Sequence, residues 1–311
     1  MDLPSTTRPS LAKRAAFRAF LLLERLGLHV QPRHFYSSVA DRRWLSGNPK
    51  LWRRRIELTG PHWDLEAQLA WLRETCATHL EEVSGFAFME RLGELGVGFR
   101  YGYVEGQVLH CAVRTLAPPR IVEVGSGAST VITADAARRN EAEGRGGSRI
   151  VAVDPYAPAE LRALDNVEVR DIPAQLVPAE LFAELGEGDL LFLDSTHVVK
   201  TGSELHRLYL EVLPSLASGV TVHVHDIYLP YLFSPWVLGD FWDWQETALL
   251  AALLTQSERF EVLCCQSALH DAVPESLREV LPDYRPLKLV DGLDRGRGEG
   301  HYPSSIWLRT R

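Results

Sequence analysis

The sequence predicts an α/β protein in which a doubly wound, seven-stranded sheet follows a helical N-terminal extension. Two observations support this fold class. Downstream of Pro118 and Pro119, short β-branched runs alternate with helical patterns, which is typical of βαβ units around a parallel sheet. The first hundred residues instead show helical patterns and no convincing strand. We therefore predict a helical cap at residues 1–100 and a Rossmann-like domain at residues 101–311.

The candidate strands are short apolar runs, and the helical patterns lie between them. The strands are expected at residues 121–124, 150–153, 167–169, 190–193, 220–224, 260–264 and 305–309. The helices are expected at residues 130–139, 159–164, 179–185, 203–216 and 246–257. This alternation predicts a sandwich with helices on both faces of one sheet.

Composition favours a globular protein that acts on small molecules. The chain has 311 residues, of which 46% are apolar, so it can fill a sizeable core. Its net charge is -8 with acids and bases mixed, which argues against a cationic face for nucleic acid. The four cysteines show no C-x-x-C spacing, so neither a zinc knuckle nor a disulfide framework is predicted, and a reducing cytoplasm fits.

The N-terminal region contains a basic, apolar segment that loosely imitates an export signal. Glu24 and Arg25 end its apolar run, residues 20–23, far short of the roughly 20 residues that a membrane span needs. We therefore interpret the segment as an amphipathic helix. We expect a cytoplasmic protein with no membrane association.

The strongest local signal is an apolar strand that enters a tight glycine turn, Gly125-Ser126-Gly127, and then a helix. Glycines at such a turn let the backbone approach a ligand closely. Glu123 lies two positions before the first glycine, where it would repel a pyrophosphate but suits the cationic amino group of a methionine moiety. Thr130 stands where a dinucleotide-binding turn has its third glycine.

A second signal is an acid at the end of the next candidate strand. Pro155 biases Asp154 toward an extended backbone at the strand rim, where the carboxylate can accept both hydroxyls of a ribose. The ring of Tyr156 either lies against an adenine or packs on the protein. Asp171, beyond the third candidate strand, either binds the adenine amino group or caps a turn.

Together with these residues, the segments LFLDSTHVVK (191–200) and VHVHDI (222–227) resemble the bacterial class I S-adenosylmethionine (SAM)-dependent methyltransferases with a catechol-methyltransferase-like core. The resemblance covers roughly residues 101–311. It implies that SAM is the cofactor and that the activity is methyl transfer. It also implies that the last strand of the sheet is antiparallel to the others.

Asp194 and Asp226 follow two candidate strands that are neighbours in such a sheet, so both carboxylates should face one crevice beside bound SAM. In the catechol-type branch, acids at corresponding strand ends hold a divalent ion such as Mg²⁺, which lowers the pKa of a substrate hydroxyl. The resemblance therefore makes both acids candidate metal ligands, and Asp194 is a candidate cofactor-binding residue as well. An Asp-Asn pair is common where His225-Asp226 stands here, so a structural role for either acid stays open.

Two histidines are candidates for general base, because an imidazole titrates near neutrality. His225 and His197 could each take the proton of an attacking hydroxyl or amine, with Asp226 as the third candidate catalytic residue. Either imidazole could instead hydrogen-bond loop carbonyls. His223 shares a strand face with His225 but lies deeper, so we expect it to be buried and structural.

An aromatic-rich insertion, residues 228–236 and 241–244, follows Asp226 and suggests either a substrate lid or a homodimer contact. The acid pair favours O-methylation of a small molecule. Three other functions stay open: transfer or cyclisation of the aminobutyrate part of SAM, a nucleotide-dependent Rossmann oxidoreductase, and a non-enzymatic scaffold.

Overall fold

The computed structural model describes residues 11–31, 34–58, 63–295 and 298–311. By their internal contacts, the residues divide into two compact units, Met1–Trp52 and Arg53–Arg311. The predicted domain boundary at residue 100 stays a prediction. The helices at residues 65–95 fall within the second unit.

The helices in the described residues of the first unit are α1 (Leu11–Arg25), α2 (Arg42–Gly47) and α3 (Pro49–Trp52). The helix α1 corresponds to the amphipathic segment of the sequence, and none of its side chains is buried. Asp41 begins α2, because its carboxylate accepts hydrogen bonds from two backbone N–H groups of the first turn. In the part of the chain that the structure describes, no helix combines the length and apolarity that crossing a membrane requires.

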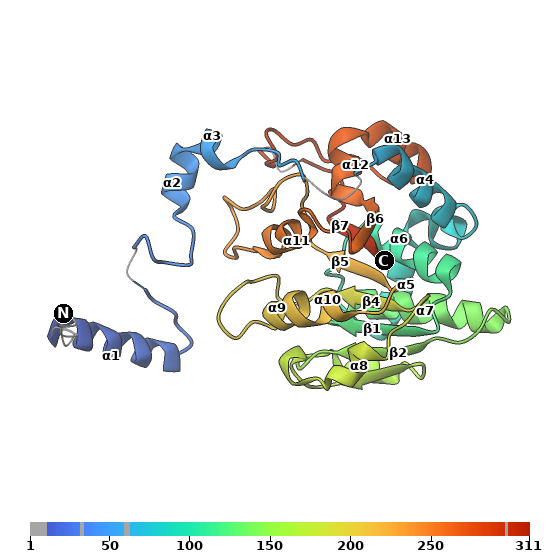
Figure 1. The fold of residues 1–311 in the computed structure, drawn as a ribbon, viewed down its shortest axis with the longest axis horizontal. Coiled ribbons are helices and arrows are strands. Elements are labelled where there is room, and N and C mark those ends of the chain that lie inside the picture. Colours follow the sequence, from blue (N-terminus) through green and yellow to red (C-terminus); the bar gives the residue numbers. More distant parts are fainter. Residues whose placement is uncertain (1–10, 32–33, 59–62, 296–297) are drawn as a thin grey trace. The chain divides into compact units, whose positions relative to one another are not determined.

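The second unit is built on a seven-stranded sheet in the order β3-β2-β1-β4-β5-β7-β6. Figure 1 shows the neighbouring strands β2, β1, β4 and β5 side by side. The strands are β1 (Arg120–Val124), β2 (Arg149–Val153), β3 (Val167–Arg170), β4 (Leu190–Leu193), β5 (Thr221–His225), β6 (Phe260–Cys265) and β7 (Ser305–Thr310). The first five run parallel, and β7 is antiparallel to both β5 and β6. The predicted α/β fold class, the seven strands and the antiparallel last strand are confirmed.

The strands are apolar along nearly their whole length because helices cover both faces of the sheet. Alternate residues point to opposite faces, so Ile121 joins one buried cluster while Val122 and Val124 join the other. The same division separates Phe192 from Leu191 on the neighbouring strand β4. This two-sided burial holds the strand ends at a fixed edge of the sheet.

The helices form one layer on each face. The first layer packs with the cluster of Ile121 and contains α4 (Leu65–Cys76), the 3-10 turns η1 (Leu80–Phe86), α5 (Phe88–Leu95), α6 (Tyr103–Leu116), α7 (Ala128–Ala142) and α13 (Pro274–Val280). The second layer contains α8 (Ala179–Ala183), α9 (Glu204–Arg207), α10 (Leu213–Ser215) and α11 (Glu246–Leu254). The helix α12 (Gln266–Ala272) contributes to both clusters.

Two predicted helices differ in kind from what the pattern suggested. The helix expected at 203–216 is interrupted by a π-helical turn, Leu208–Val212, between α9 and α10. The N–H of Leu213 donates to the carbonyl of Leu208, five residues earlier, and Pro214, which has no N–H to donate, comes next. The segment expected at 159–164 is a 3-10 helix, η2 (Ala159–Ala163), and a further 3-10 turn, η3 (Ala174–Leu176), follows β3.

A buried ionic network ties η1 to α6. Glu82 accepts hydrogen bonds from Arg114, at 3.0 Å from both Nε and Nη2, and contacts His79 at 2.8 Å and His110 at 2.9 Å. Arg114 is 1% exposed, so its charge depends on these partners. Burial alone would raise the pKa of Glu82, but the hydrogen bonds from Arg114 and the two histidines lower it to about 2.

Replacing Glu82 by glutamine should lower the free energy of unfolding at pH 7 by about 2–3 kcal/mol, because Arg114 loses its main counter-charge. A carboxylate with a lowered pKa stabilises the fold above about pH 4.5, and this contribution disappears as the pH falls toward 2. The difference between the wild type and E82Q, measured by urea unfolding, should therefore be smaller at pH 3 than at pH 7. The exposed neighbour Glu81 provides the control: E81Q should match the wild type, and equal losses in both variants would contradict the network's role.

Candidate active site

A cavity of about 830 Å³ opens where β1, β2 and β4 end. Its walls include six of the residues that the sequence predicts for the cofactor site, namely Gly125, Ser126, Gly127, Asp154, Tyr156 and Asp194. The cavity thus lies at the carboxyl edge of the parallel strands, where ligands of open α/β sheets bind. Its volume is in the range of small-molecule and cofactor sites.

The glycine turn packs closely against the end of β4. Gly125 has a φ of +93°, and a Cβ atom there would lie 1.7 Å from the carbonyl oxygen of Asp194. The N–H of Gly125 donates to the carbonyl of Val153, and the N–H of Asp194 donates to the carbonyl of Val124. Only glycine satisfies both the backbone angle and this contact. The ends of the three strands are therefore joined by backbone packing.

Asp154 is held toward the glycine turn by hydrogen bonds to both of its carboxylate oxygens. Its Oδ2 accepts from the backbone N–H of Ser126 at 3.1 Å and from the Ser126 hydroxyl at 2.9 Å. Its Oδ1 accepts from the N–H of Tyr156 at 2.7 Å. The carboxylate is fixed at the cavity wall, and Oδ1, which accepts a single hydrogen bond, keeps a lone pair for a ligand hydroxyl.

Glu123 lies beneath the turn, fully buried, and does not line the cavity. Its Oε1 accepts a 2.6 Å hydrogen bond from the hydroxyl of Ser129, which does line the cavity. Its Oε2 has no hydrogen-bond partner within the described part of the chain. Burial raises the pKa of Glu123 to about 8. A carboxylate so placed favours a positively charged group nearby.

Tyr156 and Asp171 differ from the other predicted cofactor residues in their surroundings. Tyr156 lines the cavity, but its side chain is 90% exposed, so no protein group packs its ring. Asp171 is not among the lining residues, and both of its carboxylate oxygens accept from Arg162 Nη2, at 2.5 and 2.6 Å. Adenine contacts for both residues stay predictions.

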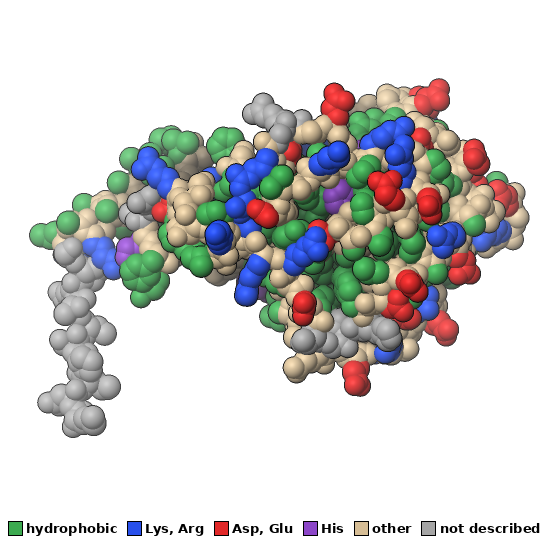
Figure 2. All heavy atoms as spheres, turned by 90° about the horizontal axis from the view of Figure 1, so that it is seen from above, with side chains coloured by type: hydrophobic (Ala, Val, Ile, Leu, Met, Phe, Trp, Pro, Cys, Tyr) green, Lys and Arg blue, Asp and Glu red, His purple; other side chains and the backbone are tan. Residues whose placement is uncertain are grey.

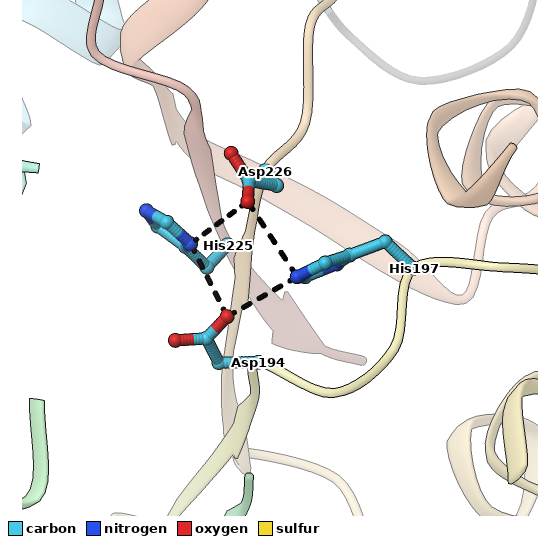
Figure 3. Close-up of side chains that lie close together, drawn as sticks. All are labelled: Asp194, His197, His225 and Asp226. Atoms are coloured by element: carbon cyan, nitrogen blue, oxygen red, sulfur yellow. Dashed lines mark hydrogen bonds and ion pairs between the residues drawn. The ribbon is translucent and has the colours of Figure 1, made fainter. Parts of the chain in front are cut away.

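A second group of side chains meets at the ends of β4 and β5. Asp194, His197, His225 and Asp226 each offer one nitrogen or oxygen atom, and these four atoms lie within 4.8 Å of one another (Figure 3). Nδ1 of His225 is 3.2 Å from Oδ1 of Asp194 and 3.5 Å from Oδ2 of Asp226. Nε2 of His197 is 3.3 Å from Asp194 Oδ1 and 3.5 Å from Asp226 Oδ2. We call these four residues the Asp-His cluster.

The sheet itself brings the cluster together. Leu193 and Val224 are register partners on the parallel strands β4 and β5, so the residues that follow them emerge at the same edge. His197 has a φ of 59° and Asp226 a φ of 54°, which is left-handed backbone that few non-glycine residues adopt. These turns direct both side chains back toward Asp194 (Figure 3).

Further residues hold the cluster from behind. His197 Nδ1 contacts Oε2 of Glu246 at 2.7 Å, and the Tyr209 hydroxyl donates to the other oxygen of Glu246 at 2.8 Å. Oδ1 of Asp226 accepts from the Tyr228 hydroxyl at 2.9 Å and from the Ser304 hydroxyl at 3.0 Å. The cluster is therefore oriented by partners from α11, the π turn and the residue before β7.

The pKa values of the side chains in the Asp-His cluster follow from their close approach to one another. Burial disfavours the imidazolium of His225, but Asp226 and Asp194 outweigh it and raise the pKa of His225 to about 9. The pKa of His197 is also raised, since Asp194 and Glu246 outweigh its burial. Burial would raise the pKa of Asp194, but the two imidazoles hold it well below its usual range.

His223 lies deeper on β5, as expected. It is 1% exposed and contacts the hydroxyl of Tyr101 at 2.8 Å and the carbonyl of Ile306 at 3.2 Å. Burial lowers its pKa to about 3. The expected burial of this residue is confirmed, and its ring packs against Trp307, with 4.0 Å between ring centroids.

The sequence did not single out Glu246, Ser304 or Tyr101. Glu246 begins α11 and contacts a histidine 49 positions earlier, and Ser304 contacts an acid 78 positions earlier. Tyr101 lines the cavity, and its ring centroid lies 4.4 Å from that of His225. The apolar pattern that marks a buried strand does not indicate contacts between residues so far apart in the sequence.

The aromatic insertion is partly packed and partly exposed. Tyr228 and Tyr231 are buried, and the ring of Trp244 lies 5.1 Å from that of His197. Phe241 and Trp242 are exposed. None of the insertion's residues lines the cavity, so both the lid and the homodimer contact stay predictions.

Charged side chains of both signs are mixed on the face drawn in Figure 2. The absence of nucleic-acid binding stays a prediction. The four cysteines are free and buried.

Comparison with known families decides the class of the domain. Residues 122–227, which include the glycine turn and the whole Asp-His cluster, match the model of a family described as a methyltransferase domain. The chain carries a SAM-dependent methyltransferase domain. A methyltransferase domain favours methyl transfer over the oxidoreductase and the non-enzymatic scaffold that the sequence left open.

Solved structures and curated proteins were also compared with the methyltransferase. The SAH-bound methyltransferase PaMTH1 of Podospora anserina is 17% identical, covers 91% of this chain and 99% of its own, and has a TM-score of 0.37. An O-methyltransferase from Bacillus cereus in complex with SAH is 14% identical, covers 80% of this chain and 100% of its own, and has a TM-score of 0.40. At these TM-scores the likenesses add nothing to the assignment. No curated protein matched.

Replacing Gly125 by alanine should destabilise the methyltransferase by about 3 kcal/mol or more, because the left-handed backbone and the overlap with the Asp194 carbonyl both oppose a Cβ atom. Thermal unfolding and SAM titration would measure the effect, and SAM affinity should fall as well. Gly98 also lines the cavity, but a Cβ there meets nothing within 4 Å, so G98A serves as the control. A G125A protein as stable as G98A would show that the close packing of Gly125 against the Asp194 carbonyl does not stabilise the fold.

Proposed function

We propose that the methyltransferase transfers the methyl group of SAM to a hydroxyl oxygen of a small molecule. One observation carries the proposal: Asp194 lines the cavity at the glycine turn and also contacts both imidazoles of the Asp-His cluster. The cavity and the Asp-His cluster therefore adjoin one another. A methyl acceptor held at the cluster would lie beside the cofactor.

The residues of the cavity fit SAM. Asp154, fixed at the wall, would accept the ribose hydroxyls, and the backbone of Gly125 and Gly127 would lie against the methionine part. Burial raises the pKa of Glu123 to about 8, and a cation bound near its unpartnered Oε2, here the amino group of the methionine part, would favour the ionised form. SAM supplies a methyl group on a sulfonium, which is a good leaving group. The protein therefore has mainly to align the acceptor and exclude water.

The Asp-His cluster would supply the reaction site. Asp194 and Asp226 direct one oxygen each toward the same space, so they would hold a divalent ion. Such an ion lowers the pKa of a hydroxyl that approaches it. His197 and His225 contact both carboxylates, so the roles of general base and of metal ligand compete for the same two nitrogens. The metal-ligand role favours an oxygen nucleophile, whereas a general base would serve a hydroxyl or an amine.

A small acceptor fits the setting of the cluster better than a macromolecule. His197 and His225 are 6% and 5% exposed, and the rings of Trp244 and Tyr101 lie beside them. A nucleic acid or protein side chain would have to enter this enclosed space. A cytoplasmic location and a homodimer belong to the same proposal and rest on the composition and on the aromatic insertion alone.

Asp154→Ala should weaken SAM binding by about 10-fold or more, because the ribose would lose its charged acceptor and Ser126 would lose two hydrogen bonds. Isothermal titration with SAM would measure the loss. Asp165 provides a matched control, since its side chain is 86% exposed and lies outside the cavity walls. D165A should bind SAM like the wild type, and equal affinities for D154A and the wild type would refute the ribose assignment.

Product analysis tests the reaction itself. Purified protein incubated with SAM and a set of hydroxylated and amine acceptors should release SAH and a methyl ether. Asp226→Ala should lower turnover by about 100-fold with little change in SAM affinity, because Asp226 serves the reaction site and does not line the cavity. Methylthioadenosine in place of SAH would indicate transfer of the aminobutyrate part, and methylated amines alone would refute O-methylation.

A further inference from the structure

We propose that Asp194, His197, His225 and Asp226 form one binding site for a divalent ion of the first transition series, with both imidazoles as ligands beside the two carboxylates. The inference deepens the proposed function, on which it rests for the ion's task in the reaction. The binding itself depends only on the geometry of the cluster. It gives the two histidines the role of ligands in place of general bases.

The four atoms surround a common centre and do not form separate pairs. Nδ1 of His225 lies 3.2 and 3.5 Å from the two carboxylate oxygens, and Nε2 of His197 lies 3.3 and 3.5 Å from the same two oxygens. Each imidazole nitrogen carries at most one proton, which cannot point along two directions at once. Figure 3 shows the four groups directed inward around one space. A single cation at that centre would contact all four atoms.

The groups behind the cluster match what metal ligands require. A ligating histidine almost always gives its other ring nitrogen to a carboxylate or carbonyl, which fixes the ring and its tautomer. Nδ1 of His197 contacts Glu246 at 2.7 Å, and Glu246 in turn accepts from Tyr209. Oδ1 of Asp226 is likewise held by two hydroxyls, which leaves Oδ2 directed at the centre.

The backbone provides an independent observation. Both His197 and Asp226 have left-handed backbone, with φ of 59° and 54°, at the points where their side chains turn toward the cluster. Such conformations cost free energy in non-glycine residues and are concentrated at functional sites. A solvent-exposed ion pair would not need them. Here they bring two side chains from separate loops to within 3.5 Å of each other.

The donor set decides which ion the site prefers. Mg²⁺ takes oxygen ligands and keeps several waters, whereas imidazole suits zinc, iron, nickel and copper, and carboxylate also suits manganese. Two nitrogens and two oxygens therefore favour a first-row transition ion over Mg²⁺. The proposed preference differs from the Mg²⁺ that the sequence resemblance implies, but Asp194 and Asp226 are ligands in both cases.

Cobalt titration of the full-length, tag-free protein after dialysis against a chelator tests the site. Co²⁺ serves as the probe because coordination by nitrogen and oxygen gives visible absorption bands. We expect one Co²⁺ per chain, displaced by equimolar Zn²⁺ but not by millimolar Mg²⁺. Failure to bind Co²⁺, or displacement of Co²⁺ by Mg²⁺ at comparable concentration, would overturn the inference.

Substitutions distinguish the residues that bind the ion from those that do not. H197A and H225A should each weaken Co²⁺ binding by at least about 10-fold and alter the absorption bands, while the exposed His29 offers a matched control and H29A should bind as the wild type does. Glu246→Ala should weaken binding by about 10–100-fold, and Glu246→Gln, which keeps an oxygen acceptor for His197, should restore most of it. Circular dichroism confirms folding of each variant, and the glutamine variant keeps the test informative if the alanine one unfolds.

The readout distinguishes this inference from the proposed function. Stoichiometric Co²⁺ binding that depends on both histidines, without any SAH formation, would support the metal site and contradict the methyl transfer to oxygen. Full SAH formation by a protein that binds no transition ion would contradict the metal site and support the methyl transfer.

Discussion

The contact between the glycine turn and the end of β4 is the constraint on which the site depends. Gly125 approaches the Asp194 carbonyl so closely that no side chain fits between them, and hydrogen bonds from both residues lock the ends of β1, β2 and β4 together. Asp194 therefore has a fixed backbone position. One side of that position faces the cofactor cavity, and the other faces the imidazoles. The sheet therefore sets the position at which the cavity adjoins the Asp-His cluster.

Much of the fold was predictable because the strands are buried on both faces. Runs such as 121–124 and 190–193 are apolar throughout, and the structure extends them by at most a residue or so. The helices were less predictable. A π turn at Leu208–Val212 and 3-10 geometry at Ala159–Ala163 arise from local hydrogen bonding that a 3.6-residue pattern does not encode. The helices α12 and α13 were missed because each has only seven residues, and α12 follows β6 directly.

The site was predictable only where its residues follow strands. Asp154, Asp194 and Asp226 were located because parallel strands end at one edge of a sheet. The sequence could not show that His197 and His225 would converge on both acids, since that depends on left-handed turns after β4 and β5. Glu246 could not be predicted for another reason. It comes from a helix that follows the aromatic insertion, and no sequence motif surrounds it. Partners of this kind are set by tertiary packing.

The position of Ser304 ties the assembly of the active site to the last strand. Its hydroxyl donates to Asp226, and its backbone N–H donates to Glu105 of α6, just before β7 enters the sheet between β5 and β6. The parallel half of the sheet and the glycine turn precede this point by many residues. During synthesis the residues of the cavity therefore precede the serine partner of Asp226. The Asp-His cluster would gain its full set of hydrogen bonds only once the strand that separates β5 from β6 is in place.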